Sequence, residues 1–356
     1  MGNMEFVRKV DLPKVIRDRY PLDDELKKVK AQNDLALRNI FTGVDDRLLL
    51  IIGPCSADRE DAVLDYCKRL RKLYEEVKDV LFFVPRIYTN KPRTTGEGYK
   101  GMLHQPDPKA DVDMVKGVIA VRKLHIDVLK ETGFSTADEM LYPDNFRYLY
   151  DVLSYQAVGA RSVENQEHRL VASGIEGPVG MKNPTSGDYK VMLNSVHAAQ
   201  QPHKFIYRGW EVETKGNELA HCILRGYTNK HGDSNPNYHY EDILRLINMY
   251  EADKYANPAI IVDCNHNNSG KLYEEQIRIA KEVLHSTRHN PLIYKYVKGL
   301  MIESYLEDGC QKVEEGVYGK SITDPCLGWE KTEKLVLDIH RLRHQARLHQ
   351  DITEID

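Results

Sequence analysis

The sequence predicts an α/β protein built as a closed (β/α)8 TIM barrel, with a helical arm before it and a short inserted β-hairpin. Short β-rich runs alternate with longer segments of helical period along most of the chain, and this order implies parallel strands joined by right-handed crossovers. Eight β-rich runs fit a closed barrel better than an open doubly wound sheet. No G-x-G-x-x-G follows the first run, which counts against a dinucleotide-binding fold.

The predicted strands share a short β-rich or apolar run, and in chain order they are Leu48–Ile52, Leu81–Tyr88, Ser135–Leu141, Ala157–Arg161, Pro178–Lys182, Cys222–Arg225, Ala259–Asp263 and Val297–Ile302. Between them, apolar residues recur at helical spacing over Asp58–Val77, Met114–Thr132, Asn145–Tyr155, Tyr240–Glu251 and Leu272–His285. A further β-rich stretch, Phe205 to Thr214, lies between the fifth and sixth strands and predicts the inserted hairpin.

Residues 1–45 have few apolar positions and many charges, and they are interrupted by Pro13 and Pro21. Apolar spacing predicts a helix over Asp23–Ile40. Two interpretations are open for this arm: an exposed helix that caps the barrel, or a contact with another subunit. Residues 46–350 are expected to form the catalytic barrel.

Composition narrows the class of protein. The 356 residues are 41% hydrophobic, which excludes disordered and collagen-like chains. The net charge of −4 gives no reason to expect a nucleic-acid partner. The longest apolar runs, such as Leu48–Ile52, are too short to span a membrane. The N-terminus lacks a signal-type apolar core, and six cysteines occur without CxxC spacing, so we expect a cytoplasmic protein with reduced thiols.

Polar or ionisable residues stand at or just beyond the ends of all eight predicted strands. In a barrel, the C-terminal strand ends deliver side chains to the active-site mouth. A barrel without this chemistry is expected to end several strands in Gly, Asn, Ser or Thr. The strand-end residues are Cys55, Arg86, Glu139, Arg161, Lys182, Arg225, His266 and Glu303.

One subset suits a divalent transition metal: Cys55, His266 and Glu303, together with Asp324 in the loop after the last strand. A thiolate, an imidazole and carboxylates form a donor set of mixed softness. No local spacing motif supports the site, and each residue alone also fits a structural role, as a buried thiol, a hydrogen-bonded imidazole or a capping carboxylate. Convergence at one barrel mouth is therefore the argument for a metal.

The second subset is cationic. Arginine and lysine side chains recognise phosphate and carboxylate oxygens, and six cations at one mouth repel one another unless anions neutralise them. Each phosphate monoester carries about −1.5 to −2 charges, so the set suits two phosphorylated ligands, or a phosphate and a carboxylate. Its members are Arg86, Lys91, Arg93, Arg161, Lys182 and Arg225.

At these residues the sequence resembles a known family, the type I, α-subclass 3-deoxy-D-arabino-heptulosonate 7-phosphate (DAHP) synthases of the shikimate pathway. The resemblance runs from about Asp45 to Trp329 and rests on six segments in the expected order: Ile52–Ser56 (IGPCS), Lys91–Thr95 (KPRTT), Gly159–Arg161, Gly180–Asn183, Ile223–Gly226 and Gly319–Asp324 (GKSITD). The related 3-deoxy-octulosonate 8-phosphate synthases carry a different, KANRSS-like loop in place of KPRTT.

The resemblance implies a metal-dependent condensation of phosphoenolpyruvate with erythrose 4-phosphate that releases phosphate. It implies one divalent metal, with Mn²⁺ favoured over Fe²⁺, Co²⁺ or Zn²⁺, and a homodimer or homotetramer. Its implied metal ligands are Cys55, His266, Glu303 and Asp324. Its implied phosphoenolpyruvate contacts are Arg86, Lys91, Arg161, Lys182 and Arg225. Its implied erythrose 4-phosphate contacts are Lys91, Pro92, Arg93 and Thr94.

Three residues are expected to act in catalysis. Lys182, or a metal-linked water, is expected to protonate the new alkoxide, and Lys91 to bridge both substrates. Glu139 is expected either to orient the attacking water or to form a salt bridge within the cationic set. Another metal-dependent barrel enzyme and a binding-only sensor are the competing interpretations.

Two departures from the family pattern stand out. Asn265 precedes His266 where Ser is more usual, and Phe205–Asn217 is shorter than in feedback-regulated members. Regulation by Phe, Tyr or Trp therefore does not carry over from the resemblance. Cys326, two residues after Asp324, is a candidate partner for Cys55 in a disulfide when metal is absent.

Overall fold

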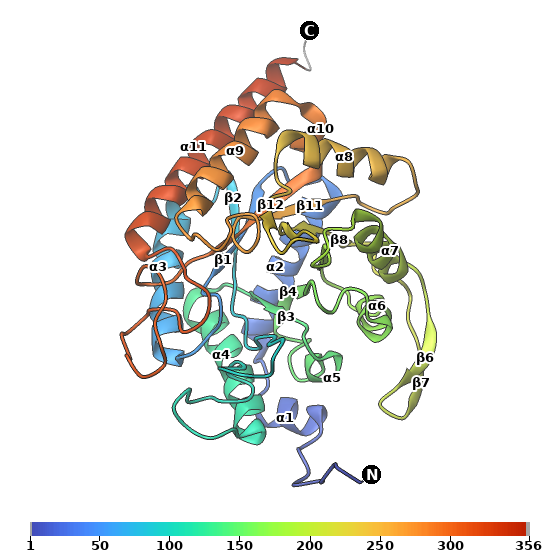
Figure 1. The fold of residues 1–356 in the computed structure, drawn as a ribbon, viewed down its shortest axis with the longest axis vertical. Helices are drawn as coiled ribbons and strands as arrows, with labels where there is room; N and C mark the ends of the chain where they lie inside the picture. Colours follow the sequence, from blue (N-terminus) through green and yellow to red (C-terminus); the bar gives the residue numbers. More distant parts are fainter. Residues whose placement is uncertain (1, 354–356) are drawn as a thin grey trace.

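Eight parallel strands form a barrel in the computed structural model, which describes residues 2–353 (Figure 1). Their order around the barrel is β2-β1-β12-β11-β8-β5-β4-β3. The two ends of this sheet meet at a parallel bridge between Arg86 and Ala137, where Ile87 N donates to Ala137 O at 2.9 Å. The strands are β1 (Leu48–Gly53), β2 (Leu81–Pro85), β3 (Thr136–Glu139), β4 (Leu153–Val158), β5 (Val179–Lys182), β8 (Ala220–Leu224), β11 (Ile260–Asp263) and β12 (Val297–Glu303).

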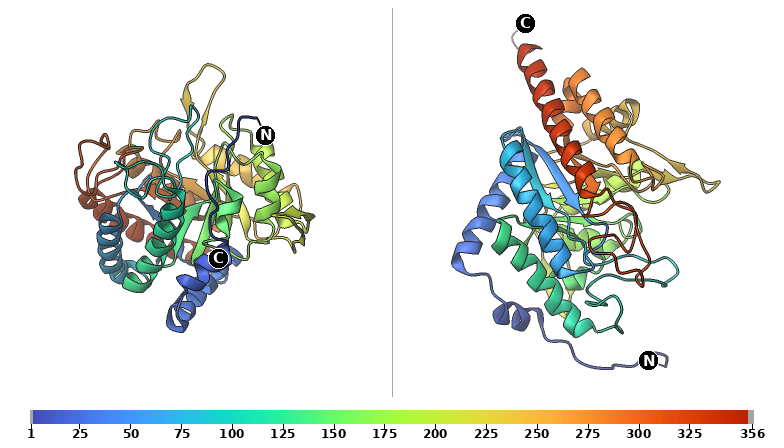
Figure 2. Two further views of the ribbon diagram at one scale, coloured as in Figure 1. Left: turned by 90° about the horizontal axis from the view of Figure 1, so that it is seen from below. Right: turned by 90° about the vertical axis from the view of Figure 1, so that its left-hand side faces the viewer.

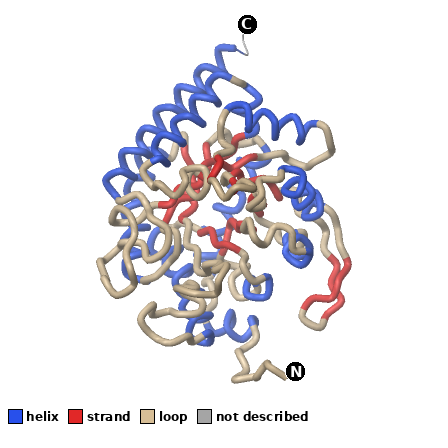
Figure 3. Tube along the Cα trace, in the orientation of Figure 1, coloured by secondary structure: helices blue, strands red, loops and turns tan. Residues whose placement is uncertain are grey.

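Helices surround the strands, as Figure 3 shows in blue and red. The sequence sets their ends: Asp113 accepts a hydrogen bond from Lys116 N at the start of α4, and Gly133, with φ of 73°, ends it. The outer helices are α3 (Glu60–Val77), α4 (Met114–Thr132), α5 (Pro143–Phe146), α6 (Gln166–Ala172), α7 (Tyr189–Gln200), α8 (Tyr240–Glu251), α9 (Glu275–His289), α10 (Pro291–Tyr296) and α11 (Trp329–Thr353).

Strand residues are buried on both faces, as expected for a barrel. Along β1, Leu48, Leu50 and Ile52 belong to the core between strands and helices, whereas Leu49 and Ile51 belong to the core inside the barrel. This alternation follows from the two-residue period of a strand. The inner core leaves the C-terminal ends of the strands free for polar residues.

The N-terminal segment, dark blue in Figure 2, leads through α1 (Pro13–Arg19) to α2 (Asp24–Thr42). The last turns of α2 bury Leu37, Ile40 and Phe41 in the core inside the barrel. The Phe41 ring lies 4.4 Å from the ring of His221 at the start of β8. Helix α2 therefore caps the barrel with one buried face. The domain boundary at residue 45 remains a prediction.

The predicted helix over Asn145–Tyr155 is wrong. Helix α5 ends at Phe146, and β4 already begins at Leu153, so the predicted strand Ala157–Arg161 starts too late and ends too far along. Consecutive i→i+3 backbone bonds, such as Leu149 N to Phe146 O and Val152 N to Leu149 O, fill the interval. These turns bury residues at a spacing of three, which resembles a helical period.

The inserted hairpin is confirmed as β6 (Lys204–Tyr207) and β7 (Trp210–Glu213). A second two-stranded ribbon, β9 (Tyr227–Thr228) with β10 (Ser234–Asn235), follows β8 and was not predicted. Within residues 2–353, no helix combines the length and the apolar character needed to cross a bilayer.

Candidate active site

A polar cavity of about 390 Å³ opens at the C-terminal ends of the strands. Twelve of the thirteen predicted site residues line it: Cys55, Arg86, Lys91, Pro92, Arg93, Thr94, Glu139, Arg161, Lys182, Arg225, His266 and Asp324. The thirteenth, Glu303, is fully buried beside it. The structure thus brings all predicted residues to one place.

Three of the predicted metal ligands form a compact group. The donor atoms of Cys55, Glu303 and Asp324 all lie within 4.8 Å of one another. His266 Nε2 lies 3.6 Å from Glu303 Oε1, so the imidazole borders the same group. One thiol, one imidazole and two carboxylates fit a divalent transition metal such as Mn²⁺, Fe²⁺, Co²⁺ or Zn²⁺.

The side chain of Lys91 shows that this position attracts a cation. Lys91 Nζ lies 2.9 Å from Cys55 Sγ and 2.7 Å from Asp324 Oδ2. Burial alone would lower the pKa of Lys91, but the nearby Cys55 and Asp324 raise it well above its usual range. Lys271 Nζ contacts the other oxygen of Asp324 at 3.1 Å. A metal ion held by Cys55, Glu303 and Asp324 would supply the positive charge that the ammonium of Lys91 supplies here.

Arg86 is tied to the metal-ligand group. Its guanidinium donates to Glu303 Oε1 at 2.7 Å and to the carbonyls of Pro54 and Cys55, and it stacks on the Tyr88 ring at 3.7 Å. Both charges are buried, which stabilises the pair only because the remaining donors are also satisfied. Arg86 lines the cavity and also fixes the orientation of Glu303.

Sequence analysis missed Asp263, the last residue of β11. It is fully buried, with Oδ2 located 2.8 Å from His266 Nδ1, a contact without hydrogen-bond alignment, and 3.4 Å from Lys182 Nζ. Burial would raise the pKa of Asp263, but His266 and Lys182 hold it well below its usual range. Its place at a strand end was the available signal.

Two asparagines beside His266 were also missed as site residues. Asn265 Nδ2 donates to Glu303 Oε2 at 2.5 Å, so the residue that replaces the more usual Ser contacts a predicted metal ligand. Asn267 Oδ1 accepts a 2.5 Å hydrogen bond from Arg225. His266 between them has φ of 51°, a conformation unusual for a non-glycine residue, which turns this loop over the cavity.

Arg161 and Arg225 form the free cationic part of the wall. Neither has an ion pair among residues 2–353, and Arg161 is exposed to the cavity. The pKa of Arg225 is lowered, first by burial and then by the charge of Arg161. Two neighbouring guanidinium groups without carboxylate partners have the chemistry that recognises an anion.

The predicted neighbourhood of Cys55 and Cys326 is present. Cys55 N donates to Cys326 Sγ at 3.3 Å, and all six cysteines are free. Both thiols are buried. The pairing of the two remains a prediction.

A family profile described as the DAHP synthetase I family matches residues 25–337. The chain belongs to this family. The chain is 38% identical over 341 residues to a phospho-2-dehydro-3-deoxyheptonate aldolase of Haemophilus influenzae, covering 94% of this chain and 91% of that protein. It is 36% identical over 338 residues to the Tyr-sensitive aldolase of Escherichia coli, covering 92% of each.

The fold comparison agrees with the family. A solved phospho-2-dehydro-3-deoxyheptonate aldolase from Francisella tularensis superposes with a TM-score of 0.89 at 30% identity, covering 97% of this chain and 99% of that one. The resemblance stated from the six motifs is confirmed, and so is the prediction of a DAHP synthase activity for this family member. The roles of single residues are a separate question.

Proposed function

We propose that this DAHP synthase family member joins phosphoenolpyruvate to erythrose 4-phosphate with water, releasing phosphate, through the residues of the 390 Å³ cavity. One observation carries the assignment of roles: unpaired arginines and a metal-ligand group share that cavity. Two polyanionic substrates repel each other in water. A wall of fixed cations removes this repulsion and holds the reacting carbons together.

The cations divide naturally between the two substrates. Five of the cations that line the cavity are assigned to the phosphate and carboxylate of phosphoenolpyruvate: Arg86, Lys91, Arg161, Lys182 and Arg225. Arg93, on the loop that also carries Pro92 and Thr94, is placed to hold the phosphate of erythrose 4-phosphate. Lys91 lies between the loop and the metal-ligand group, so it can contact both substrates.

Cys55, His266, Glu303 and Asp324 are the proposed ligands of one divalent ion, with Mn²⁺ favoured. When bound, the ion supplies Lewis-acid stabilisation of the negative charge that develops on the aldehyde oxygen. Asn265 and Arg86 each donate a hydrogen bond to Glu303 and so orient it. Asp263 lies against the imidazole of His266, with Oδ2 located 2.8 Å from Nδ1. Such outer contacts fix ligand geometry.

Lys182 is the proposed proton donor to the new alkoxide. Its side chain is buried, with Nζ located 3.4 Å from Asp263 Oδ2, and it lines the cavity. Glu139 lines the same cavity and forms no ion pair within the described chain, which favours orienting the attacking water over a salt bridge. Together they place an acid and a base on one wall.

The function is tested by measuring phosphate release. We expect release when both phosphoenolpyruvate and erythrose 4-phosphate are present, loss of activity with a chelator, and recovery with Mn²⁺. Repeating the assay with Phe, Tyr and Trp tests whether an aromatic amino acid inhibits this enzyme. Two relatives are named Tyr-sensitive and Phe-sensitive. Release from phosphoenolpyruvate alone contradicts the proposed reaction.

Replacing Lys182 by Met tests the proton donor and the cationic wall together. The variant keeps the side-chain length but removes the charge, so we expect kcat to fall by about 10²–10³, the usual effect of losing one fixed electrostatic donor. The matched control is Lys190→Met, an exposed lysine at the start of α7. Near wild-type turnover of Lys182→Met contradicts the model of the wall.

We also propose a cytoplasmic homodimer or homotetramer. Free cysteines suit a reducing compartment, and large apolar side chains are exposed on the arm and on the β6–β7 hairpin, among them Phe6, Val7, Ile206 and Trp210. Exposed apolar patches of this kind mark subunit contacts. Light scattering of the Trp210→Glu variant should give a smaller assembly than the wild type, and a monomeric wild type contradicts the proposal.

A further inference from the structure

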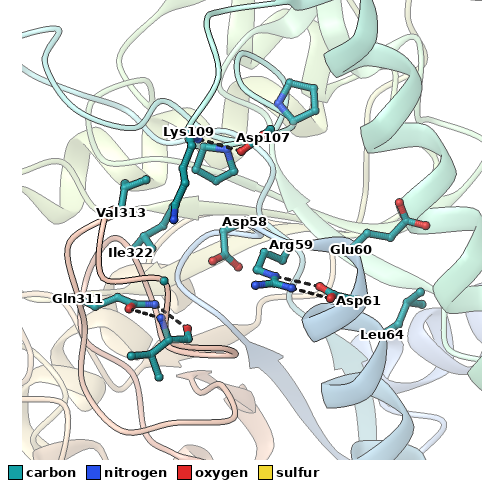
Figure 4. Close-up of a pocket in the computed structure, with 14 residues that line it drawn as sticks. Asp58, Arg59, Glu60, Asp61, Leu64, Asp107, Lys109, Gln311, Val313 and Ile322 are labelled. Atoms are coloured by element: carbon teal, nitrogen blue, oxygen red, sulfur yellow. Dashed lines mark hydrogen bonds and ion pairs between the residues drawn. The ribbon is translucent and has the colours of Figure 1, made fainter.

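A second cavity, of about 620 Å³, lies outside the active site and shares none of its lining residues. Its walls come from three loops at the C-terminal ends of the strands: the β1–α3 loop with the first turns of α3, the β2–α4 loop, and the β12–α11 loop. Figure 4 shows side chains of these loops facing one another. Cavities of this volume are typical of sites for small organic ligands.

All three loops contribute hydrocarbon side chains to the wall: Leu64, Pro106, Pro108, Val313, Val317 and Ile322. Hydrocarbon side chains beside charged groups are typical of a site that binds an organic ion. The two prolines make their side of the wall stiff. The lining therefore favours a ligand with an apolar body.

The ionisable groups leave the cavity negatively charged. Arg59 is already engaged, with a 2.7 Å ion pair to Asp61 and a stacking contact with Tyr318. The positive end of the α3 dipole adds about half a charge, which does not cancel the excess of carboxylates. The groups are four carboxylates and two cations: Asp58, Glu60, Asp61 and Asp107 against Arg59 and Lys109.

Asp58 is a buried carboxylate of this cavity without a cationic partner. Its side chain is 4% exposed, accepts a 2.9 Å hydrogen bond from Tyr305 Oη, and forms no ion pair within the described chain. It lies in the middle of the cavity in Figure 4. Burial raises its pKa to about 6, because a desolvated carboxylate without a cation is costly to ionise.

We propose that this cavity binds a small organic cation, with an ammonium group against Asp58 and an apolar body between the loops. The ligand thus supplies the charge that Asp58 lacks, and its body covers the hydrocarbon wall. Lys109 forms no ion pair among the described residues, so its flexible side chain can turn to solvent when the cation enters. Primary amines with an apolar body have this chemistry.

The segments that line the cavity also carry the proposed metal ligands, so we expect the two sites to be coupled. Asp58 follows Cys55 by three residues, Tyr305 follows Glu303 by two, and Ile322 precedes Asp324 by two. The two loops are also tied directly, since Thr323 Oγ1 donates to Ser56 Oγ at 3.1 Å. A ligand that shifts these segments therefore changes metal affinity, and metal must change ligand affinity by the same factor.

Calorimetric titration of the full chain with 2-phenylethylamine tests the site. We expect saturable binding of 2-phenylethylamine. Binding should be much weaker for 2-phenylethanol, which lacks the ammonium charge, and for ethylamine, which lacks the apolar ring. No saturable binding of any ammonium compound at millimolar concentration overturns the proposal.

Variants locate the binding. Asp58→Asn should weaken 2-phenylethylamine by about tenfold or more, the usual effect of losing a charged hydrogen bond. Val317→Trp, at a half-exposed position, should block the cavity without changing charge. Glu314→Gln, on the same loop but outside the lining, is the matched control. Binding that is unaffected by both Asp58→Asn and Val317→Trp overturns the assignment of the site.

Coupling is measured without substrates, so its outcome does not depend on the proposed reaction. Saturating 2-phenylethylamine should change the dissociation constant for Mn²⁺ by about fivefold or more in wild-type protein and leave it unchanged in Val317→Trp. An identical Mn²⁺ affinity with and without the amine overturns the coupling.

Discussion

Asn267 holds the side chain of Arg225, a proposed phosphoenolpyruvate contact. It accepts a hydrogen bond from Arg225 and donates to Thr228 and Ser234 on the β9–β10 ribbon. Asn267→Ala leaves Arg225 charged but unrestrained, so we expect the KM for phosphoenolpyruvate to rise about five- to tenfold, equivalent to about 1 kcal/mol. Steady-state kinetics should show kcat nearly unchanged.

The matched control is Asn235→Ala. Asn235 lies on the β9–β10 ribbon that Asn267 contacts, but its side chain donates to the carbonyl of Asp233. If Asn267 were merely structural, both variants would lose stability and kcat together. A rise in KM confined to Asn267→Ala identifies it as a positioning residue, and equal kinetics in the two variants contradict this role.

The titration of Asp58 is expected to make the stability of the protein depend on pH. The pKa of Asp58 is raised from 3.8 to about 6 in the folded protein, first by burial. The folded state then holds the proton more tightly than the unfolded state, so the contribution of Asp58 to stability is greatest below about pH 3.8 and is lost as pH rises to about 6. The full effect is about 3 kcal/mol.

Asp58→Asn removes this titration and keeps an acceptor for Tyr305. We expect the variant to be about 1–3 kcal/mol more stable than wild type at pH 8 and no more stable at pH 4, measured by urea denaturation. A stability difference that does not change between pH 4 and pH 8 contradicts the raised pKa.

At the scale of elements, the strands were predictable because β1 and its neighbours are short runs of buried apolar residues between helices of clear period. Predictions fail where another structure has the same spacing: the turns around Leu149 and Val152 bury every third residue as a helix does. Arg161 was placed at a strand end, although β4 stops at Val158. It reaches the cavity from the loop instead.

The sequence did not decide whether helix α2 caps the barrel or contacts another subunit, because apolar spacing does not identify the surface that a helix covers. The buried Phe41 answers this for one face. Phe41→Ala should lower the free energy of unfolding by about 3–5 kcal/mol, as for other large-to-small core changes. Leu35→Ala, exposed on the same helix, should change it by less than about 0.5 kcal/mol.

Chemical denaturation of both variants gives the comparison. Equal, small effects would mean that residues 1–45 are a dispensable arm. A large effect confined to Phe41→Ala means that α2 is part of the barrel floor and that the arm cannot be removed without exposing the core.

For the whole molecule, the barrel brings together groups that no local motif connects. Cys55 and Asp324 are separated by 269 residues, yet their side chains are 3.7 Å apart. Strand ends and resemblance predicted this convergence. They did not predict the contacts of Asp263, Asn265 and Asn267, which depend on how one loop turns, or the second cavity, whose walls come from three loops.

Because the proposed metal ligands join the segment after the first barrel strand (Cys55) to the end of the last strand (Glu303), metal binding should stabilise the entire barrel. At a Mn²⁺ concentration of 100 times Kd, we expect a gain of about 2.7 kcal/mol in the free energy of unfolding. The gain should be smaller at pH 6 than at pH 8. Burial and Glu303 raise the pKa of the Cys55 thiol, which must lose its proton to bind metal, so binding weakens as pH falls.

Denaturation with and without Mn²⁺ at both pH values measures this gain. Cys55→Ser should lose most of it, whereas Cys310→Ser, at an exposed cysteine outside the site, should keep it. A gain that persists in Cys55→Ser would remove the thiol from the ligand set, and with it the reason for the pH dependence. If the Mn²⁺-dependent gain is kept in Cys310→Ser and lost in Cys55→Ser, the metal stabilises the protein through the segment that joins β1 to α3.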